Sequence, residues 1–153
     1  MAHDGQYDLM IETPVMKDIL ALTQQAVKPL ETLNTKAINN LRELVTLDNK
    51  VSSSLIETHQ SAAHGVAWLA TYTESIRQMV KWGEKVSEQN KFGQTEQLLL
   101  QIAVSEYLGQ ILGGIMMSQG EIFRLNDIGL TTLDLSEFQT QAVKDLIQNG
   151  NNQ

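Results

Sequence analysis

The 153-residue chain carries 18 acidic and 11 basic residues, and its net charge of −7 disfavours a nucleic-acid partner, because phosphate binding needs clustered lysines and arginines. The same acidic balance disfavours binding to an anionic membrane surface. Cysteine is absent, which excludes disulfides, thiolate metal sites and cysteine nucleophiles. The first residues have neither the basic nor the apolar segment of a signal peptide, so we expect a cytoplasmic protein.

The first predicted helix begins at Thr13-Pro14 and carries an apolar residue every three or four positions as far as Leu44. Threonine can cap a helix, and proline at the first helical position gives up only an amide that has no partner. Pro29 lies inside this stripe, so we expect a kink or a break near it, and we favour a kink because the stripe keeps its phase. Residues 1–12 are expected to be a flexible N-terminus.

A second long helix is predicted after a polar turn at positions 47–51. Serines 52–54 can cap this helix, and Ser54 has capping-box spacing to Glu57. We expect the helix to end between Asn90 and Gly93, with Gly93 in the left-handed conformation that closes many helices.

Two adjacent apolar stripes run along the second helix, which predicts contacts with more than one neighbour. The side chains of the second stripe include Trp68, Tyr72, Met79 and Trp82. If exposed, these four residues form a patch large enough to need a partner, and we take them as interface candidates.

A third helix is predicted from Thr95 to about Met117 or Gln119, and it contains the most apolar stretch of the chain. Four polar residues interrupt that stretch near helical spacing, which indicates one wetter stripe on a buried helix rather than a membrane span; they are Gln101, Ser105, Glu106 and Gln110. Glycine in a helix costs roughly 1 kcal/mol against alanine. We therefore expect close helix packing at Gly109, Gly113 and Gly114.

The remaining chain is predicted to be irregular from 120 to 133, with a turn at 127–129, and then to form a short helix capped by Ser136 with Gln139. Residues 149–153 form a polar tail. The predicted fold class is all-α: a helical bundle of three long helices plus a short C-terminal helix, forming a single domain over 13–148.

Candidate chemistry is sparse. His59 and His64 are five residues apart and point about 140° apart around a helix, so they cannot hold one ion together, and no Glu-x-x-His pair is present. Metal binding is therefore not expected. Glu106 is either a buried carboxylate with a raised pKa or part of the polar stripe, and we favour the stripe. No catalytic residues are predicted, and His64 and Glu106 are kept as ligand candidates.

Several segments resemble the helical N-terminal extension of acyl-CoA dehydrogenase-family flavoproteins of the 2-methylsuccinyl-CoA dehydrogenase type. The likeness covers roughly residues 55 to 130. It is carried by AAHGVAWLATY at 62–72, IRQM at 76–79, EQL through EYL at 96–108, GGIMMSQGEI at 113–122, Arg124 and the turn DIGL at 127–130.

In that family the flavin, the acyl-CoA and the catalytic glutamate belong to the dehydrogenase fold that follows the extension. The resemblance therefore implies no catalytic or flavin-binding residue here, and we expect no cofactor and no enzyme activity of the chain by itself. A free-standing relative and an excised piece both remain open.

Two classes of function remain. The domain is a structural or interaction module, which forms a homo-oligomer or packs against an acyl-CoA dehydrogenase, or it binds an apolar or acyl-type ligand in its core beside His64 and Glu106. An exposed surface at the four interface candidates favours the first class, and a deep apolar cavity favours the second. We favour the first, because bundles usually fill their cores with side chains.

Overall fold

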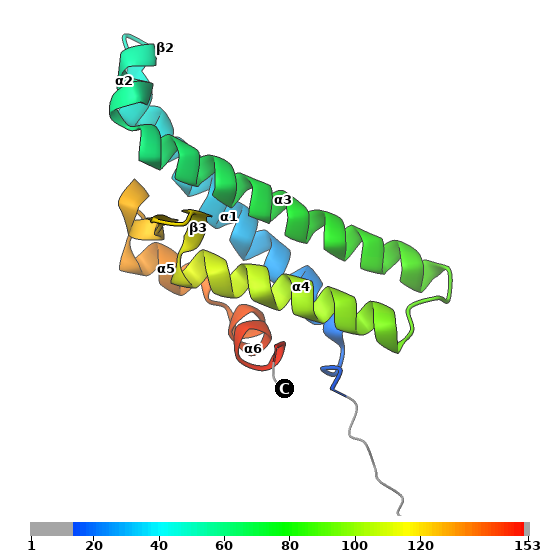
Figure 1. The fold of residues 1–153 in the computed structure, drawn as a ribbon. Helices are drawn as coiled ribbons and strands as arrows, with labels where there is room; N and C mark the ends of the chain where they lie inside the picture. The colour runs from blue at the N-terminus through cyan, green and yellow to red at the C-terminus, as the bar shows by residue number, and fades with distance from the viewer. Residues whose placement is uncertain (1–13, 152–153) are drawn as a thin grey trace, which may run out of the picture.

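Two long helices that run in opposite directions, α1 (Ile19–Val45) and α3 (Gln60–Glu88), form the frame of the fold in the computed structural model, which describes residues 14–151 (Figure 1). A third helix, α4 (Gln94–Gly113), returns along α3, and α6 (Gln141–Asn149) packs against α1 and α4. The predicted all-α bundle is confirmed.

Short elements connect these helices. They are the hairpin strands β1 (Thr46–Leu47) and β2 (Lys50–Val51), helix α2 (Ser53–Thr58), strands β3 (Ile115–Ser118) and β4 (Glu121–Phe123), the 3-10 helix η1 (Leu125–Ile128) and helix α5 (Thr132–Phe138). Each pair of strands is antiparallel, and the two pairs form separate two-stranded sheets.

Helix α1 starts later than predicted. Residues 1–13 lie outside the described chain, and Pro14 precedes the helix rather than opening it. Asp18 adopts a left-handed backbone with φ of 55°, so helical geometry is established only at Ile19. The helix then continues through Pro29 to Val45, which rules out a break; the kink that we favour there stays a prediction.

The second predicted helix is divided in two, which the sequence did not indicate. Ser52 has extended backbone and its hydroxyl accepts a hydrogen bond from the Leu55 amide, so it is the cap of α2. The predicted capping box at Ser54 is wrong, because Ser54 already lies inside the helix, with its hydroxyl 2.9 Å from that of Ser52. His59 (φ −106°, ψ 31°) leaves helical geometry and separates α2 from α3.

The turn between α3 and α4 is closed by a different residue from the one predicted. Asn90, not Gly93, is left-handed, with φ of 55°, and asparagine tolerates this region better than most residues. Gly93 has φ of −80° and occupies the cap position of α4. Helix α4 therefore begins at Gln94, one residue before the predicted start at Thr95.

Helix α4 ends at Gly113, and not at 117–119 as predicted. Gly114 follows with φ of 126°, a conformation that other residues rarely adopt, and the chain then turns into the hairpin β3–β4. Ile115 pairs with Phe123 in this hairpin, and both side chains are buried against the bundle.

The predicted fourth helix is also two helices. Thr131 caps α5 through a capping box with Asp134, and Thr140 accepts a hydrogen bond from the Val143 amide to cap α6. Ser136 lies within α5 and is not a cap. The break lies at Gln139 (ψ 57°) and Thr140 (ψ 166°), whose ψ values are not helical, and the Thr140 hydroxyl then caps the new helix.

The core is filled from all the main helices. Its largest fully buried side chains include Leu30 and Leu33 of α1, Leu69 and Ile76 of α3, Leu100, Leu108 and Ile111 of α4, Phe138 of α5, Leu146 of α6 and Phe123 of β4.

Only one of the three glycines predicted to allow close packing has a close neighbour, and Gly65, which was not predicted, has one too. Within residues 14–151, a Cβ atom at Gly109 or Gly113 would meet no atom of another element within 4 Å, so the prediction of close packing is wrong for both positions in this part of the chain. Gly114 does have a close neighbour, with Ile122 Cγ2 2.7 Å from such an atom. At Gly65 the Cβ would lie 2.0 Å from the ring of Phe123, so this glycine lets β4 pack onto α3.

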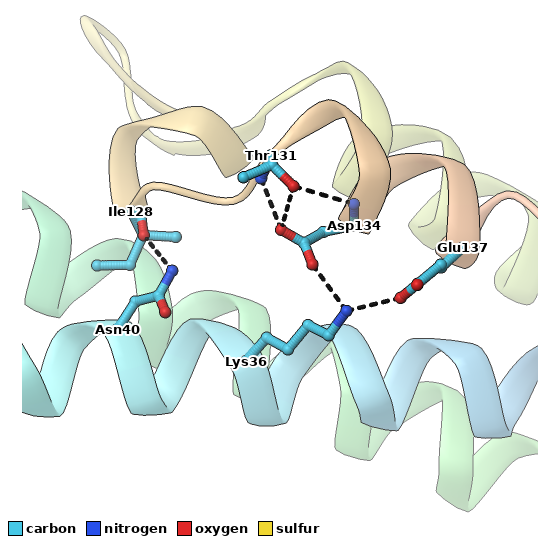
Figure 2. Close-up of polar contacts among 6 residues, drawn as sticks. All are labelled: Lys36, Asn40, Ile128, Thr131, Asp134 and Glu137. Carbon is cyan, nitrogen blue, oxygen red and sulfur yellow. Dashed lines mark hydrogen bonds and ion pairs between the residues drawn. The ribbon is translucent and has the colours of Figure 1, made fainter.

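A polar cluster joins α5 to α1. Lys36 Nζ lies 2.7 Å from Asp134 Oδ1 and 2.6 Å from Glu137 Oε2, and Asn40 donates to the Ile128 carbonyl at 2.8 Å (Figure 2). Asp134 also accepts from both the amide and the hydroxyl of Thr131. Hydrogen bonds from Lys36 and then from Thr131 lower the pKa of the Asp134 carboxyl well below its usual range.

This cluster predicts an acid-dependent contribution to stability. Because the pKa of Asp134 is lower in the folded than in the unfolded chain, its stabilisation is present above the unfolded value and is lost as pH falls through the folded one. Asp134→Asn should therefore lower the midpoint of urea unfolding at pH 7, and the difference from wild type should shrink as the solution becomes strongly acidic. Glu57→Gln, on α2, is the control, and a pH-independent difference would contradict this assignment.

Candidate functional site

An open apolar groove of about 670 Å³ lies on the outer side of the α3–α4 pair. Most of its wall is hydrocarbon and aromatic surface, and it is open to solvent rather than enclosed. Its lining consists of Ser75, Gln78, Met79 and Trp82 from α3, and of Ile102, Ala103, Glu106 and Tyr107 from α4. These residues lie about one helical turn apart on each helix, so the antiparallel packing of α3 and α4 brings them together.

Stacked aromatic rings extend the groove toward the start of α3. The ring centroids of Tyr72 and Tyr107 are 4.6 Å apart, and those of Trp68 and Tyr72 are 6.2 Å apart with the planes perpendicular. The Tyr72 hydroxyl donates to Gln110 Oε1 at 2.8 Å. Burial, and to a smaller extent the neighbouring Tyr107 and Glu106, raise the pKa of Tyr72, which keeps this hydroxyl protonated as a donor.

The four interface candidates lie along this one face. Met79 and Trp82 line the groove, Tyr72 packs beside Tyr107, and Trp68 donates from its indole nitrogen to His64 Nε2 at 3.0 Å. All four are half-buried and pack against the core with part of their surface. The structure thus places them together, with their outer edges exposed.

Leu99 and Ile102 of α4, which sequence reasoning missed, are the most exposed apolar side chains of this face, at 53% and 46% exposure. They stand one turn apart on α4, and Ile102 lines the groove. A signal was present: the helix from 94 to 113 has only two charged residues, Glu96 and Glu106, and its apolar residues cover every side. A helix that is apolar all round has more apolar surface than one core can bury.

The two ligand candidates are separated. His64 is exposed and is absent from the groove lining, whereas Glu106 lines the groove, is exposed, and accepts from Gln110 at 3.0 Å and Asn151 at 2.7 Å. The polar-stripe interpretation is therefore confirmed for Glu106. It is wrong for Gln101 and Ser105, each only 3% exposed, because the chain ends and α6 cover that side of α4.

Metal ligation and membrane insertion find no support in residues 14–151. Within this part of the chain no three histidine, aspartate or glutamate side chains gather as a metal site would need, and no helix combines the length and apolarity required to cross a bilayer. His59 is half-buried at the junction of α2 and α3 and does not meet His64 on one helix face.

The geometry defines a class: an all-helical bundle with an apolar, solvent-open groove between two antiparallel helices. The chain is similar to the (2S)-methylsuccinyl-CoA dehydrogenase of Cereibacter sphaeroides, with 46% identity over 142 residues. The match covers 93% of this chain but only 25% of that enzyme, its N-terminal quarter. The resemblance to an N-terminal acyl-CoA dehydrogenase-like domain is thus confirmed, and the chain spans about a quarter of its curated relative. No family model matches it.

Proposed function

We propose that this chain is a non-catalytic helical domain that mediates self-association or docking to an acyl-CoA dehydrogenase through the α3–α4 groove. The groove carries the proposal, because it joins exposed Ile102 to the half-buried Met79 and Trp82 in one continuous apolar surface. Aromatic and apolar side chains of this kind dominate the centres of protein interfaces. The similarity to only a quarter of a dehydrogenase supports a role that leaves the chemistry to another part of such an enzyme.

The second candidate, binding of an apolar or acyl-type ligand, is favoured by the apolar wall of the same groove. Three observations weigh against it. The groove is open along its length, whereas small-molecule sites enclose most of their ligand, and His64 does not reach it. The core positions beneath it, such as Leu100 and Leu108, are occupied by fully buried side chains.

Trp82→Glu should weaken association at least about thirty-fold, since a central tryptophan commonly contributes about 2 kcal/mol to an interface. Light scattering over a concentration series measures self-association, and binding to an immobilised acyl-CoA dehydrogenase measures docking. Ile102→Glu should act in the same direction and, with its side chain 46% exposed, leaves the core intact.

The matched control is Leu133→Glu, which changes an apolar side chain of α5 that is 67% exposed and lies away from the groove. Circular dichroism verifies folding of each variant. The proposal is wrong if both groove variants associate as the wild type does, or if the wild type associates with neither partner while binding a fluorescent acyl-CoA in the groove.

A further inference from the structure

Resting on the proposed role of the groove as a contact surface, we infer that the chain's own N-terminal segment, residues 7–11, covers it when no partner is bound. The segment reaches the groove across the exposed apolar side of α4. The position where the chain enters the fold, the surface between that position and the groove, and the spacing of apolar residues before Pro14 all lead to this assignment.

The chain enters the fold at Gln101 of α4. The side-chain nitrogen of Gln101 donates to the Pro14 carbonyl at 3.1 Å, and its oxygen accepts from the Met16 amide at 2.7 Å. Gln101 is only 3% exposed, and Val15 and Met16 pack against the core. The polypeptide that precedes Pro14 therefore starts from a fixed point at the surface of α4.

An apolar strip on α4 connects that point to the groove. Around the helix, which turns by about 100° per residue, Ile102 follows Gln101 by about 100° and Leu99 follows it by about 160°. Tyr107, which lines the groove, follows at about 240°. Leu99 and Ile102 are 53% and 46% exposed, and Ile102 lines the groove as well. The exposed apolar surface of α4 thus begins beside the entry point and ends in the groove.

The residues before Pro14 carry an apolar run at a matching distance. The run is Leu9-Met10-Ile11, and Tyr7 lies two residues before it. Because an extended chain advances at most about 3.3–3.6 Å per residue, the run can lie from about 10 Å (Ile11) to about 18 Å (Leu9) beyond Pro14. The path around α4 from Gln101 to Leu99 is about 15 Å for a helix of ordinary diameter. The apolar run can therefore reach the strip and the near edge of the groove.

A tethered segment also has an advantage over a separate molecule. A short tether holds its end at an effective concentration of about 1 mM, whereas a second copy or a dehydrogenase competes at its actual concentration in solution. A partner that uses the groove must then displace residues 7–11, so the segment lowers the apparent affinity of the groove for that partner.

The exposure of Trp82 tests the covering. In a Trp68→Phe background, Trp82 is the sole tryptophan of the chain, and it lines the groove. Combining Leu9→Ser, Met10→Ser and Ile11→Ser should raise the acrylamide quenching constant of Trp82 at least about twofold, because a tethered segment occupies its site in most molecules. The matched control combines His3→Ser, Gln6→Ser and Glu12→Ser, and circular dichroism verifies folding. Equal quenching in the two variants overturns the inference, as does wild-type quenching that rises on dilution, since a contact within one chain does not depend on concentration.

Cross-linking locates the segment in the otherwise unchanged protein. The chain has no cysteine, so Met10→Cys combined with Leu99→Cys offers a single possible disulfide within the molecule. The control pair is Met10→Cys with Asn149→Cys, because Asn149 precedes Gly150, whose carbonyl accepts from the same Gln101 nitrogen as Pro14 at 3.0 Å. The Leu99 pair should form its disulfide at least about tenfold faster under mild oxidation. Equal rates would show that the segment has no preference for the groove side of α4.

Failure of this inference is distinguishable from failure of the proposed function. If quenching and cross-linking reveal no covering while Trp82→Glu weakens association, the groove binds another molecule only, and the proposed function stands. If both measurements reveal covering, and the serine variant binds neither a second copy nor an immobilised acyl-CoA dehydrogenase, the inference stands and the proposed function is wrong.

Discussion

Replacing Gly65 by alanine is expected to lower the free energy of unfolding by about 3 kcal/mol, although alanine is the better helix former by about 1 kcal/mol. The added methyl carbon would lie 2.0 Å from Phe123 Cδ2 and 2.3 Å from Cγ, well inside van der Waals contact. The ring cannot move away easily, because Phe123 is only 2% exposed and β4 is held in place by its pairing with β3. The hairpin would therefore be pushed away from α3.

Gly109→Ala is the matched control, since a methyl group there meets no other element within 4 Å in the described part of the chain and should stabilise the fold by up to about 1 kcal/mol. Gly65→Ala combined with Phe123→Leu should cost less than the sum of the two single changes, because the smaller side chain leaves room for the methyl group. Urea unfolding gives all four values. Equal midpoints for Gly65→Ala and wild type would show that β4 does not pack on α3 at this point.

The long helices could be predicted because the pattern that indicates each of them is spread over many residues. The three- and four-residue spacing of apolar side chains persists over many turns, and it assigned the buried faces of α1 and α3 correctly, including Leu30, Leu69 and Ile76. The ends of the helices depend on single backbone conformations instead. Asn90 took the left-handed position that Gly93 was expected to occupy, and either residue type can adopt it.

The hairpin β3–β4 could not be read from its own residues. Its first strand, Ile115–Ser118, continues the apolar run of α4 without a charge or a proline, so a longer helix fits the pattern equally well. The division is fixed by Gly114, whose φ of 126° no helix allows, and by the place that Gly65 leaves for Phe123 on a distant element. Such long-range fit has no local signature.

Half of the candidate site was visible in the sequence. Met79 and Trp82 belong to a stripe whose width exceeds what one neighbour can bury, and that excess was the correct indication of a surface. The sequence did not identify Leu99 and Ile102 as exposed residues, because every side of α4 is apolar. Which side remains exposed is decided by where α1, α3 and α6 pack, and this is known only from the assembled fold.

Gln101→Met is expected to destabilise the fold by about 3 kcal/mol, the second large effect, despite the similar volume of the two side chains. Gln101 is 3% exposed and forms three hydrogen bonds with the main chain. Its oxygen accepts from the Met16 amide at 2.7 Å, and its nitrogen donates to the carbonyls of Pro14 at 3.1 Å and Gly150 at 3.0 Å. One side chain thus fixes the segment before α1 and the end of α6 on the same side of α4.

Methionine removes all three hydrogen bonds and supplies no replacement. The Met16 amide and the Gly150 carbonyl then lose their partner at a place where water has little access. Each polar group left unsatisfied in this way costs about 1–3 kcal/mol. Hydrogen exchange of the Met16 amide should accelerate along with the loss of stability.

Gln110→Met, on the same helix, is the control: it removes contacts to Tyr72 and Glu106 in a half-buried setting and should cost about 1 kcal/mol. Gln101→Glu separates the two halves of the interaction, because its carboxylate still accepts from Met16 but faces two carbonyl oxygens without a proton to donate. If Gln101→Met unfolds at the same urea concentration as Gln110→Met, and exchange at Met16 is unchanged, the two chain ends are held by the surrounding apolar contacts and not by this side chain.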